Sequence, residues 1–429
     1  MERSRFTTLM AIAMAVGAGL GSCTQAVTAP VTAPTAVAEP TPSQPEPEPV
    51  AVEPALPGAT EGAGSGAVAD EFPEDGLPED RLPEDGLQET SPVIGAPPTY
   101  RIVGVGDIMM GSDWPQPGMD PRITPGSDPA MVMGPDMVQL FQSAEVVFGN
   151  YEGTIHSSDQ NAKRCGNPQF CYVFRSPAFH ANYLQRAGFT LMSHANNHAR
   201  DFGETGRTAT VANLRGAGIA VAGGDRDGMR IAVQTLEDGR RVALVAFGHN
   251  PGLLSVQNYS RVTEMVQAAD AQADIVIVSC HIGAEGARHD RVTRQTEIFL
   301  QEDRGNPFRF ARTAVDAGAD IVFCHGPHIP RAVEVYQGRF IAYSLGNFWT
   351  YGRFNLRGHN GLAPIAQLDV DAEGALVAAQ IISARQDRPG GPYLDRSNAA
   401  AQRTAVLTAR DFPEGRVTIA SDGTLSWPR

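Results

Sequence analysis

The chain has 429 residues, of which 42% are hydrophobic, and a formal net charge of −14. This length allows one large domain or two ordinary ones with a substantial core. Residues 24 to 98 contain fourteen acidic residues and one basic residue, so this segment alone carries −13 of the charge and the remainder is close to neutral. The remainder also lacks the basic stripe and the aromatic platform that nucleic-acid binding needs, so we expect no nucleic-acid partner.

The first 22 residues have the layout of a secretory leader. Arg3 and Arg5 precede the apolar run "FTTLMAIAMAVGAGL", which is too short and too rich in small residues for a membrane span. "LGSC" at 20 to 23 resembles a bacterial lipobox, whose cysteine is lipidated; the alternative is ordinary signal cleavage with an incidental Cys23. We predict a lipoprotein signal peptide at 1–22, export, and anchoring of Cys23 to a membrane by acyl chains.

Residues 23–98 form the next segment. They consist largely of Pro, Ala, Glu and Val and contain the degenerate repeat "FPEDG", "LPEDR", "LPEDG". Such a composition cannot bury enough apolar surface to fold. We predict a disordered acidic linker whose prolines make it an extended spacer.

Residues 99–429 read as one α/β domain. Short apolar runs such as "YRIVGVGD", "ADIVIVSCH" and "RFIAYSLGNF" alternate with helix-like stretches. Two of these stretches carry helix start signals, "SPAFHANYLQRAG" with a serine and "NPFRFARTAVDAG" with Pro after a capping Asn. Alternating strands and helices predict a layered α/β fold with a mixed sheet. Residues 362–384 and 404–427 are predicted to be further strands that complete a second sheet.

Polar side chains follow six of the apolar runs. They are Asp107; Asn150 and Glu152; Asn196, Asn197 and His198; His281 and Glu285; His325 and His328; and Asn347. One such residue alone is usually a turn former or a helix cap. Here polar residues recur at six strand ends, and the strand ends of an α/β sheet gather at one rim. This recurrence predicts that the residues form a common site. The mixture of oxygen and imidazole ligands suits a divalent ion such as Mn²⁺, Fe²⁺ or Zn²⁺.

Four of the five cysteines fall into two pairs. Cys165 and Cys171 bracket the short loop "CGNPQFC", which we predict to close as a disulfide in an oxidising compartment; two free thiols are the alternative. Cys280 and Cys324 each precede a histidine at the end of an apolar run. Because neighbours on a strand point to opposite faces, we predict that these two are buried structural thiols.

Five motifs carry a family resemblance. In chain order, "VGDIMMG", "NYEGTI", "ANNHARDFG", "HIGAE" and "HGPHIPRAVEVYQGRFIAYSLGNF", over about residues 101 to 350, resemble the motif set of the CapA family. That family is associated with poly-γ-glutamate capsule synthesis, and its fold resembles that of calcineurin-like metallophosphoesterases. The resemblance implies a four-layered α/β/β/α sandwich with one or two divalent ions at one rim.

The resemblance also implies roles for single residues. The matching metal ligands are Asp107, Glu152, Asn197, His281, His325 and His328. His198 matches the histidine that lies beside the amide without binding metal; we expect it to donate a proton to the leaving group, oriented by Asp201. Substrate contacts are expected from Asn150, Asn196, Glu285 and Asn347. The chain departs from the calcineurin-like pattern where Met109 replaces a histidine, where Glu152 replaces a bridging aspartate, and where Asp201 lies three residues after His198.

Two functions follow as hypotheses. The first is an envelope-anchored, metal-dependent hydrolase of capsule or poly-γ-glutamate synthesis, cleaving a phosphoester or a γ-glutamyl amide bond. The second is a non-catalytic lipoprotein that keeps the fold and a structural metal and binds the polymer during capsule assembly. Both imply an anionic envelope polymer or its precursor as partner, together with a capsule-synthesis membrane complex on the periplasmic or outer face.

Overall fold

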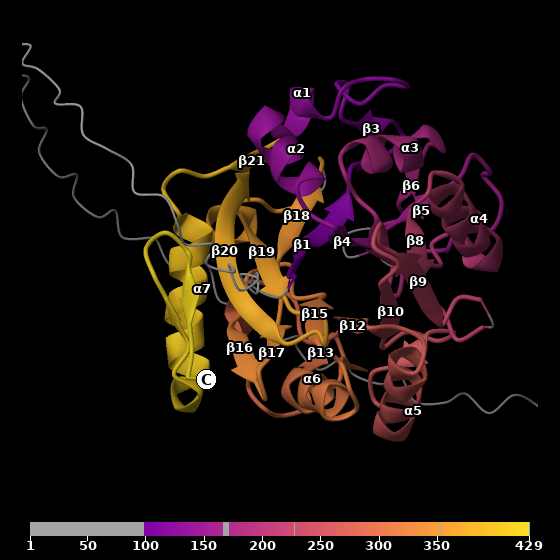
Figure 1. Ribbon diagram of the computed structural model, residues 1–429. Coiled ribbons are helices and arrows are strands. Elements are labelled where there is room, and N and C mark those ends of the chain that lie inside the picture. Colours follow the sequence, from indigo (N-terminus) through magenta and orange to yellow (C-terminus); the bar gives the residue numbers. More distant parts are fainter. Residues whose placement is uncertain (1–97, 166–170, 227, 353, 429) are drawn as a thin grey trace, which may run out of the picture. The chain divides into compact units, whose positions relative to one another are not determined.

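The computed structural model describes residues 98–165, 171–226, 228–352 and 354–428. The predicted leader, Cys23 and the predicted linker up to residue 97 lie outside these residues. The described part contains two main β-sheets with helices on their outer faces (Figure 1). None of its helices has the length and apolar character that crossing a bilayer requires.

The first sheet is mixed and is built around β1. Its order is β21 (Pro392–Leu394), β20 (Leu376–Gln386), β19 (Leu362–Val370), β1 (Tyr100–Met109), β4 (Val146–Tyr151), β7 (Leu191–Ser193) and β8 (Ala220–Ala222), and β18 (Asn347–Thr350) pairs with β1. β1 is parallel to β4 and β18 and antiparallel to β19. Nine of the ten residues of β1 are buried, as expected for a strand covered on both faces.

The second sheet is built around β12. Its order is β11 (Leu254–Ser255), β10 (Arg241–Gly248), β12 (Ile275–His281), β15 (Ile321–His325), β17 (Arg339–Ala342) and β16 (Val333–Tyr336), and β9 (Ile231–Thr235) pairs with β10. β10, β12, β15 and β17 run parallel, so their carboxyl ends lie at one edge. Four small two-stranded sheets join β2 (Gly111–Ser112) to β3 (Gly118–Met119), β5 (Thr154–Ile155) to β6 (Arg175–Ser176), β13 (Ile298–Phe299) to β14 (Glu302–Asp303), and β22 (Thr418–Ile419) to β23 (Leu425–Ser426).

Three apolar clusters separate four layers. The middle cluster joins the facing sides of the two sheets, where the rings of Phe148 and Phe323 stack at 5.1 Å. A second cluster joins the first sheet to α1 (Ala130–Met133), α2 (Pro135–Gln142), α3 (Phe179–Arg186) and α4 (Gly203–Gly216). A third joins the second sheet to α5 (Tyr259–Asp270) and α6 (Pro307–Asp316). The predicted α/β/β/α sandwich is confirmed.

The two helices with predicted start signals differ at their first turn. α6 begins as expected, with Pro307 at its first position and the Asn306 side chain accepting the amide hydrogen of Arg309 at 2.9 Å. α3 forms, but its N-cap is Ala178 and no side chain caps it. Burial of His180, Ala181, Tyr183 and Leu184 therefore fixes α3 more than capping does.

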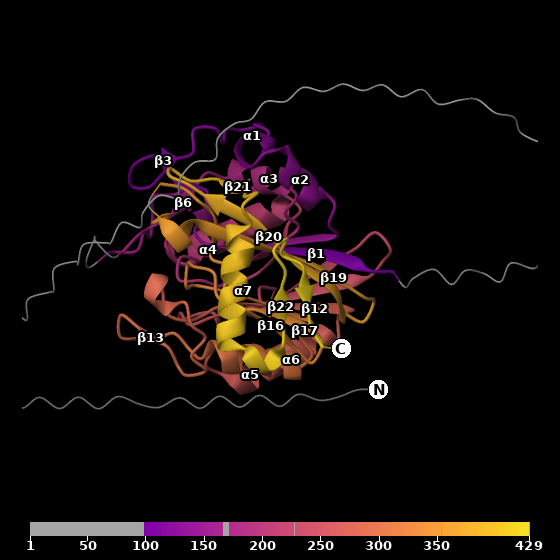
Figure 2. The same ribbon diagram turned by 90° about the vertical axis from the view of Figure 1, so that its left-hand side faces the viewer.

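The carboxyl-terminal part corrects two predictions. β19 and β20 are strands, but they extend the sheet of β1 instead of completing a second sheet. Most of the predicted strand region 404–427 is wrong, because α7 (Ala399–Asp411) occupies its beginning and only the short β22 and β23 follow. The run "AAAQRTAVLTARD" is rich in strong helix formers. α7 contacts β20 of the first sheet and β16 of the second, and Figure 2 looks onto it where it crosses both sheets.

Candidate metal centre

The predicted site residues meet because the strands that carry them end in register. Asp107 of β1 lies opposite Asn150 of β4 on one side and Asn347 of β18 on the other. In the facing sheet, His281 of β12 lies opposite His325 of β15. The first sheet therefore supplies carboxylate and amide groups, and the second supplies imidazoles.

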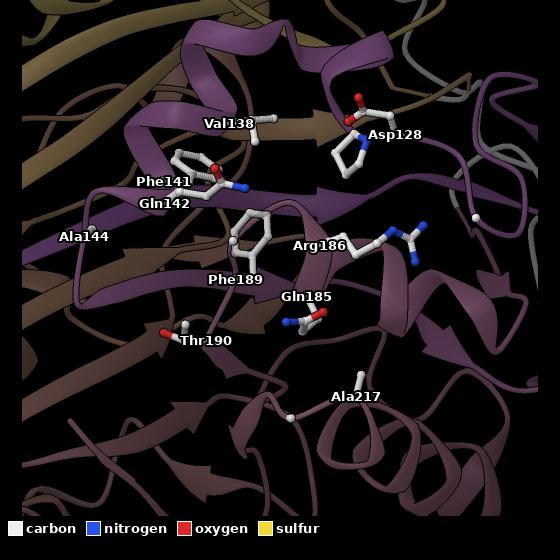
Figure 3. A pocket seen from close by; sticks show the side chains of 14 residues that line it. Asp128, Val138, Phe141, Gln142, Ala144, Gln185, Arg186, Phe189, Thr190 and Ala217 are labelled. Carbon is white, nitrogen blue, oxygen red and sulfur yellow. The ribbon is translucent and has the colours of Figure 1, made fainter. Parts of the chain in front are cut away.

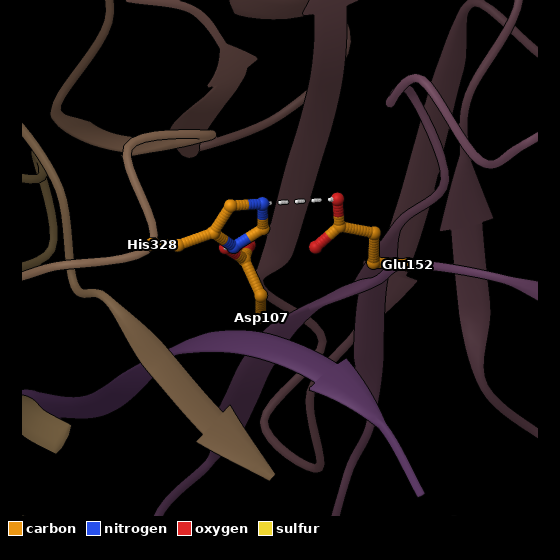
Figure 4. Close-up of side chains that lie close together, drawn as sticks. All are labelled: Asp107, Glu152 and His328. Atoms are coloured by element: carbon orange, nitrogen blue, oxygen red, sulfur yellow. Dashed lines mark ion pairs between the residues drawn. The ribbon is translucent and has the colours of Figure 1, made fainter. Parts of the chain in front are cut away.

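Three side chains form the centre of this group. Ligand atoms of Asp107, Glu152 and His328 all lie within 4.8 Å of one another (Figure 4). His328 points its Nδ1 at Asp107 Oδ2, 3.1 Å away, and its Nε2 at Glu152 Oε1, 3.6 Å away. His328 has a φ of 57°, a left-handed conformation that is uncommon for a residue other than glycine. Irregular backbone thus aims this imidazole between two buried carboxylates.

Two further histidines border the same group. His325 Nδ1 lies 3.1 Å from Asp107 Oδ1, and His281 Nε2 lies 3.9 Å from Glu152 Oε1. Both imidazoles are almost completely buried. Asn197 lies in the wall of the adjoining pocket together with His328. All six predicted metal ligands are therefore at this rim, with Asp107, Glu152 and His328 at its middle.

Unpaired polar atoms test whether this rim suits a metal ion. The buried atoms without a hydrogen-bond partner in the described part of the chain include Asp107 Oδ2, both Glu152 oxygens, Asn197 Oδ1, and both ring nitrogens of His281 and of His325. The His325 and His328 contacts to Asp107 are close but are not aligned as hydrogen bonds. Buried polar atoms without partners are costly in a folded protein. Their concentration in five candidate ligands fits a bound cation.

The protonation states are set by burial and by the paired charges. Burial disfavours the Asp107 carboxylate, but contacts with His325 and His328 outweigh it and lower the pKa of Asp107. Burial likewise disfavours the His328 imidazolium, but Glu152 and Asp107 outweigh it and raise the pKa of His328 well above its usual value. Burial raises the pKa of Glu152 to about 8, partly offset by the charge of His328. Burial lowers the pKa of His281, which keeps that imidazole neutral and able to bind metal.

Amide side chains hold the ligands in place. Asn150 Nδ2 donates to Asp107 Oδ1 at 2.8 Å, and Asn196 Nδ2 donates to Asn150 Oδ1 at 3.1 Å. Asn347 Oδ1 lies 3.0 Å from His328 Nδ1, and its Nδ2 donates to the His328 carbonyl at 3.2 Å. Asn150, Asn196 and Asn347 were expected to contact substrate. The structure also gives them contacts with ligands and with one another, which is how outer residues orient a metal site.

His198 and Asp201 form a buried pair. His198 Nδ1 lies 2.8 Å from Asp201 Oδ2, which also accepts the backbone amide hydrogen of Phe174 at 2.7 Å. The other oxygen, Asp201 Oδ1, lies 2.5 Å from Lys163 Nζ. The Asp201 side chain is fully buried, so these three contacts fix its position. The ring of His198 then faces the pocket beside the metal ligands.

Two neighbours of this site were missed at the sequence level. Lys163 is the only lysine among the 429 residues, which include 33 arginines. This bias in composition is the one sequence feature that could have drawn attention to Lys163. His249, directly after β10, was given no role; its Nδ1 lies 3.4 Å from the His281 carbonyl, and the two rings stack at 6.0 Å. Its position after an apolar run was the same signal that identified His281 and His325.

A pocket of about 890 Å³ opens beside these residues, and Asn197, His198 and His328 line it. Glu285, predicted to contact substrate, lines it as well and pairs with Arg304 at 2.8 Å. A second hollow of about 740 Å³ lies elsewhere, between α2, α3 and the end of α4, where Phe141, Phe189 and Arg186 line it (Figure 3). None of the predicted site residues that the structure describes lines that second hollow, so we place the chemistry in the first pocket.

The structure contains two disulfides among the described cysteines. One joins Cys165 and Cys171, the predicted pair. The other joins Cys280 and Cys324, which corrects the prediction of two free buried thiols. These cysteines are register partners on the parallel strands β12 and β15, with Cα atoms 4.6 Å apart, so both side chains point to the same face and meet. The bridge ties together the strand ends that carry His281 and His325.

Comparison with known proteins identifies relatives. Residues 101–351 match the family model described as "Bacterial capsule synthesis protein PGA_cap". The chain is 29% identical over 233 residues to the PGA biosynthesis protein CapA of Bacillus subtilis, covering 50% of this chain and 57% of that protein. It is 27% identical over 223 residues to the capsule biosynthesis protein CapA of Bacillus anthracis, covering 48% and 51%. The chain thus spans about half the length of the curated relatives it matches.

Among solved structures, the chain is similar to a 5′-nucleotidase precursor from Thermus thermophilus, with a TM-score of 0.34 and 14% identity over 69% of this chain and 54% of that one. At such a TM-score the likeness establishes nothing about function. The family model, in contrast, matches more than half of the chain and contains every predicted metal ligand. The chain therefore belongs to the PGA_cap family of bacterial capsule synthesis proteins, the family of CapA.

Proposed function

We propose that this protein is a metal-dependent hydrolase of capsule or poly-γ-glutamate-type polymer synthesis, acting on a phosphoester or a γ-glutamyl amide bond of the polymer or its precursor. One observation carries the proposal: buried ligand atoms of Asp107, Glu152, Asn197, His281 and His325 have no hydrogen-bond partner in the described structure and lie at one rim. Such an arrangement is costly unless a bound group supplies the missing partners, and a divalent cation fits this set of oxygen and nitrogen atoms. Membership of a capsule synthesis family supports the biological setting.

The residues present would hold one or two divalent ions. The mixture of oxygen and nitrogen donors suits Mn²⁺, Fe²⁺ or Zn²⁺. The ligands would be Asp107, Glu152, Asn197, His281, His325 and His328. A bound divalent ion supplies Lewis acidity toward the scissile group and lowers the pKa of attacking water. The protein contributes the geometry, because the Asn150 and Asn347 amides hold Asp107 and His328 in place.

The leaving group requires a proton, and His198 lies where it can donate one. Its Nδ1 contacts Asp201, so the opposite ring nitrogen, Nε2, is the one that can serve the substrate. Asp201 is held by the Phe174 amide and by Lys163, which keeps the imidazole in one orientation. His198 would transfer its proton to the departing oxygen or nitrogen as the scissile bond breaks.

The setting we propose is the cell envelope. The leader-like residues 1–22 and the lipobox-like "LGSC" support export and a lipid anchor at Cys23. The proline-rich stretch at 23–98 would hold the catalytic domain away from the membrane. The proposed partners are an anionic envelope polymer or its precursor and a capsule-synthesis membrane complex.

Metal analysis followed by activity assays tests the proposal. We expect the purified chain to contain Mn, Fe or Zn by mass spectrometry, and to hydrolyse either a phosphoester or a γ-glutamyl peptide. His198→Ala should retain the metal and lose turnover, whereas His281→Ala should lose both. A metal-free protein that cleaves neither class after reconstitution with each metal would refute a hydrolase.

A second candidate function is supported by Met109. This buried residue stands where calcineurin-like enzymes have a histidine, and its sulfur accepts the Gly111 amide hydrogen at 3.3 Å. With one ion only, the protein would have less charge neutralisation for phosphoryl transfer, which favours a non-catalytic, polymer-binding capsule-assembly factor. That function predicts metal-site variants that lose polymer retention although no turnover is measurable in the unmodified protein.

A further inference from the structure

One wall of the pocket beside the metal centre is a row of aromatic rings. The ring centroids of Tyr172 and Phe174 lie 6.0 Å apart with planes 8° from parallel, and those of Phe174 and Phe354 lie 5.6 Å apart at 24°. At the inner end, Phe174 packs on His198 at 4.4 Å and Phe354 on His328 at 5.8 Å. The row therefore leads from the half-exposed Tyr172 to the proposed proton donor and to a proposed metal ligand.

The β13–β14 hairpin also lines the pocket. Phe299 and Leu300 of this hairpin line the pocket, and the guanidinium of Arg304 lies over the Phe299 ring at 5.3 Å. Leu300 has a φ of 48° and is 67% exposed, so the hairpin tip presents an apolar side chain at the opening. Two separate groups of apolar side chains thus line the pocket, and its volume lies within the range of small-molecule sites.

Amide side chains supply most of the remaining polar lining. Five asparagines line the pocket: Asn197, Asn250, Asn347, Asn355 and Asn360. The Oδ1 atoms of Asn250 and Asn360 are buried and have no hydrogen-bond partner in the described residues. Each amide can both donate and accept, which matches a ligand rich in hydroxyl groups because a hydroxyl does the same.

The charged residues in the lining are already paired. Lys163 contacts Asp201 at 2.5 Å, and Arg304 contacts Glu285 at 2.8 Å and Glu302 at 2.9 Å. Within the described lining, no Lys or Arg is therefore left to pair with a ligand carboxylate. A γ-glutamyl chain carries one carboxylate per residue and would need such cations. Apart from His328 and the proposed metal beside it, the described lining offers no cation for a row of carboxylates.

From these features we infer that the pocket binds an uncharged saccharide unit. The ring C–H groups of a sugar pack on aromatic faces, whose π-systems are negative, while its hydroxyls pair with the asparagine amides. The position of the saccharide next to the bond to be cleaved rests on the proposed hydrolysis. If the pocket binds a saccharide there, the substrate is a sugar-linked phosphoester and not a γ-glutamyl amide. Saccharide binding itself needs no turnover.

Calorimetric titration of the full chain tests the inference. The ligands are three uncharged disaccharides, N,N′-diacetylchitobiose, cellobiose and maltose, and a γ-glutamyl tetrapeptide, each at low and high salt. At least one disaccharide should bind with an affinity that salt does not change, and the tetrapeptide should not displace it. Tyr172→Ala should weaken this binding about tenfold. Failure of all three disaccharides, or displacement by the tetrapeptide, would overturn the inference.

A matched control is Tyr393→Ala. Tyr393 is 39% exposed and Tyr172 is 38% exposed, but Tyr393 does not line this pocket. It should leave disaccharide affinity unchanged; equal weakening by both variants would also overturn the inference. Saturation-transfer NMR on the unmodified chain gives a readout independent of either variant, with the sugar C–H protons receiving the strongest saturation if they face the aromatic wall. Uniform saturation over the sugar would contradict that placement.

Failure of the inference can be told from failure of the proposed function. Saccharide binding without hydrolysis of any phosphoester or γ-glutamyl substrate would contradict the proposed hydrolase alone. Hydrolysis by a chain that binds none of the disaccharides would contradict the saccharide site alone.

Discussion

The two sheets contribute different chemistry to the rim. The first sheet supplies oxygen ligands and amides, with Asp107 at the end of β1 and Glu152 just after β4. The second supplies imidazoles, with His281 and His325 at the ends of β12 and β15. The middle apolar cluster packs the sheets together, so neither half of the site exists without the other. The candidate metal centre is therefore a property of the packed sandwich and not of any single motif.

The two halves of the rim also differ in the protonation of their side chains. Burial keeps His281 neutral, so the imidazole half can bind metal directly. In the oxygen half, burial raises the pKa of Glu152 to about 8, so this carboxyl group holds a proton at neutral pH until a cation replaces it. His328 follows the second sheet but lies between the carboxylates, and its raised pKa makes it a cation in the metal-free protein.

Asp107→Asn should break the connection between the two halves. Asp107 contacts both His325 and His328, so loss of its charge removes one ligand and loosens two others. We expect metal affinity to fall by more than about a hundredfold and turnover to become undetectable. Metal content and hydrolysis rates measure this. Asp369→Asn is the control, because Asp369 is in β19 of the same sheet and its side chain pairs with Arg101, away from the rim. Metal retained by Asp107→Asn would contradict the assignment.

Metal binding should release protons. At pH 7 the adjoining Glu152 and His328 of the metal-free protein share protons that a cation would displace, whereas His281 holds none, so binding should release at least one proton. Affinity should therefore rise steeply from pH 6 to pH 8. Calorimetry in two buffers of different ionisation enthalpy measures the number released. Equal apparent binding enthalpies in both buffers would show that the carboxyl group and imidazole are already deprotonated.

The same shift has a consequence for stability. Because the pKa of Glu152 is higher in the folded state than in the unfolded chain, its contribution is fully present at low pH and is lost as pH rises through about 8. The metal-free domain should therefore unfold at lower denaturant concentration at pH 9 than at pH 7, and the metal-bound domain should show less of this loss. Urea unfolding followed by circular dichroism measures both.

The rim was predictable from sequence because apolar runs mark strands and the residue after a run marks the strand end. Asp107, His281 and His325 follow from that rule. The sheet to which a strand belongs cannot be predicted by that rule, since the apolar patterns of β19 and β20 would be the same in either sheet. α7 was mistaken for strand because its alternating apolar residues fit both periods over a short stretch, while the alanines favoured helix.

Contacts that depend on register or on loops were harder to predict. Cys280 and Cys324 meet because β12 and β15 pair residue for residue, and a shift of one position would separate the two side chains. Lys163 reaches Asp201 from an irregular segment 38 positions earlier in the chain, where no periodic pattern exists. The local pair of His198 with Asp201 could be proposed from spacing, whereas the residues that hold Asp201 could not.

Asn347→Ala should weaken the join between the halves without removing a ligand. Asn347 belongs to β18 in the first sheet, and both ends of its amide contact His328. We expect metal affinity to fall about 10- to 100-fold, as for other residues that orient a ligand. Competition with a chelator measures it. Asn355→Ala is the control, since Asn355 lines the same pocket but its side chain accepts from the Arg357 amide and no contact with His328 is seen among the described residues. Equal effects of the two variants would contradict a specific role for Asn347.

Lys163→Met should have the smallest effect and act only on the proton donor. Lys163 pairs with Asp201, which holds His198, and the described structure shows no contact of Lys163 with a proposed metal ligand. Its loss leaves Asp201 Oδ1 buried without a partner, so we expect kcat to fall about tenfold while metal content stays the same. Lys163→Arg should restore most of the rate. In an Asp201→Asn background the Lys163→Met change should have little further effect, because the two residues act through one contact. Equal losses in both backgrounds would mean that Lys163 serves the substrate directly and not the position of His198.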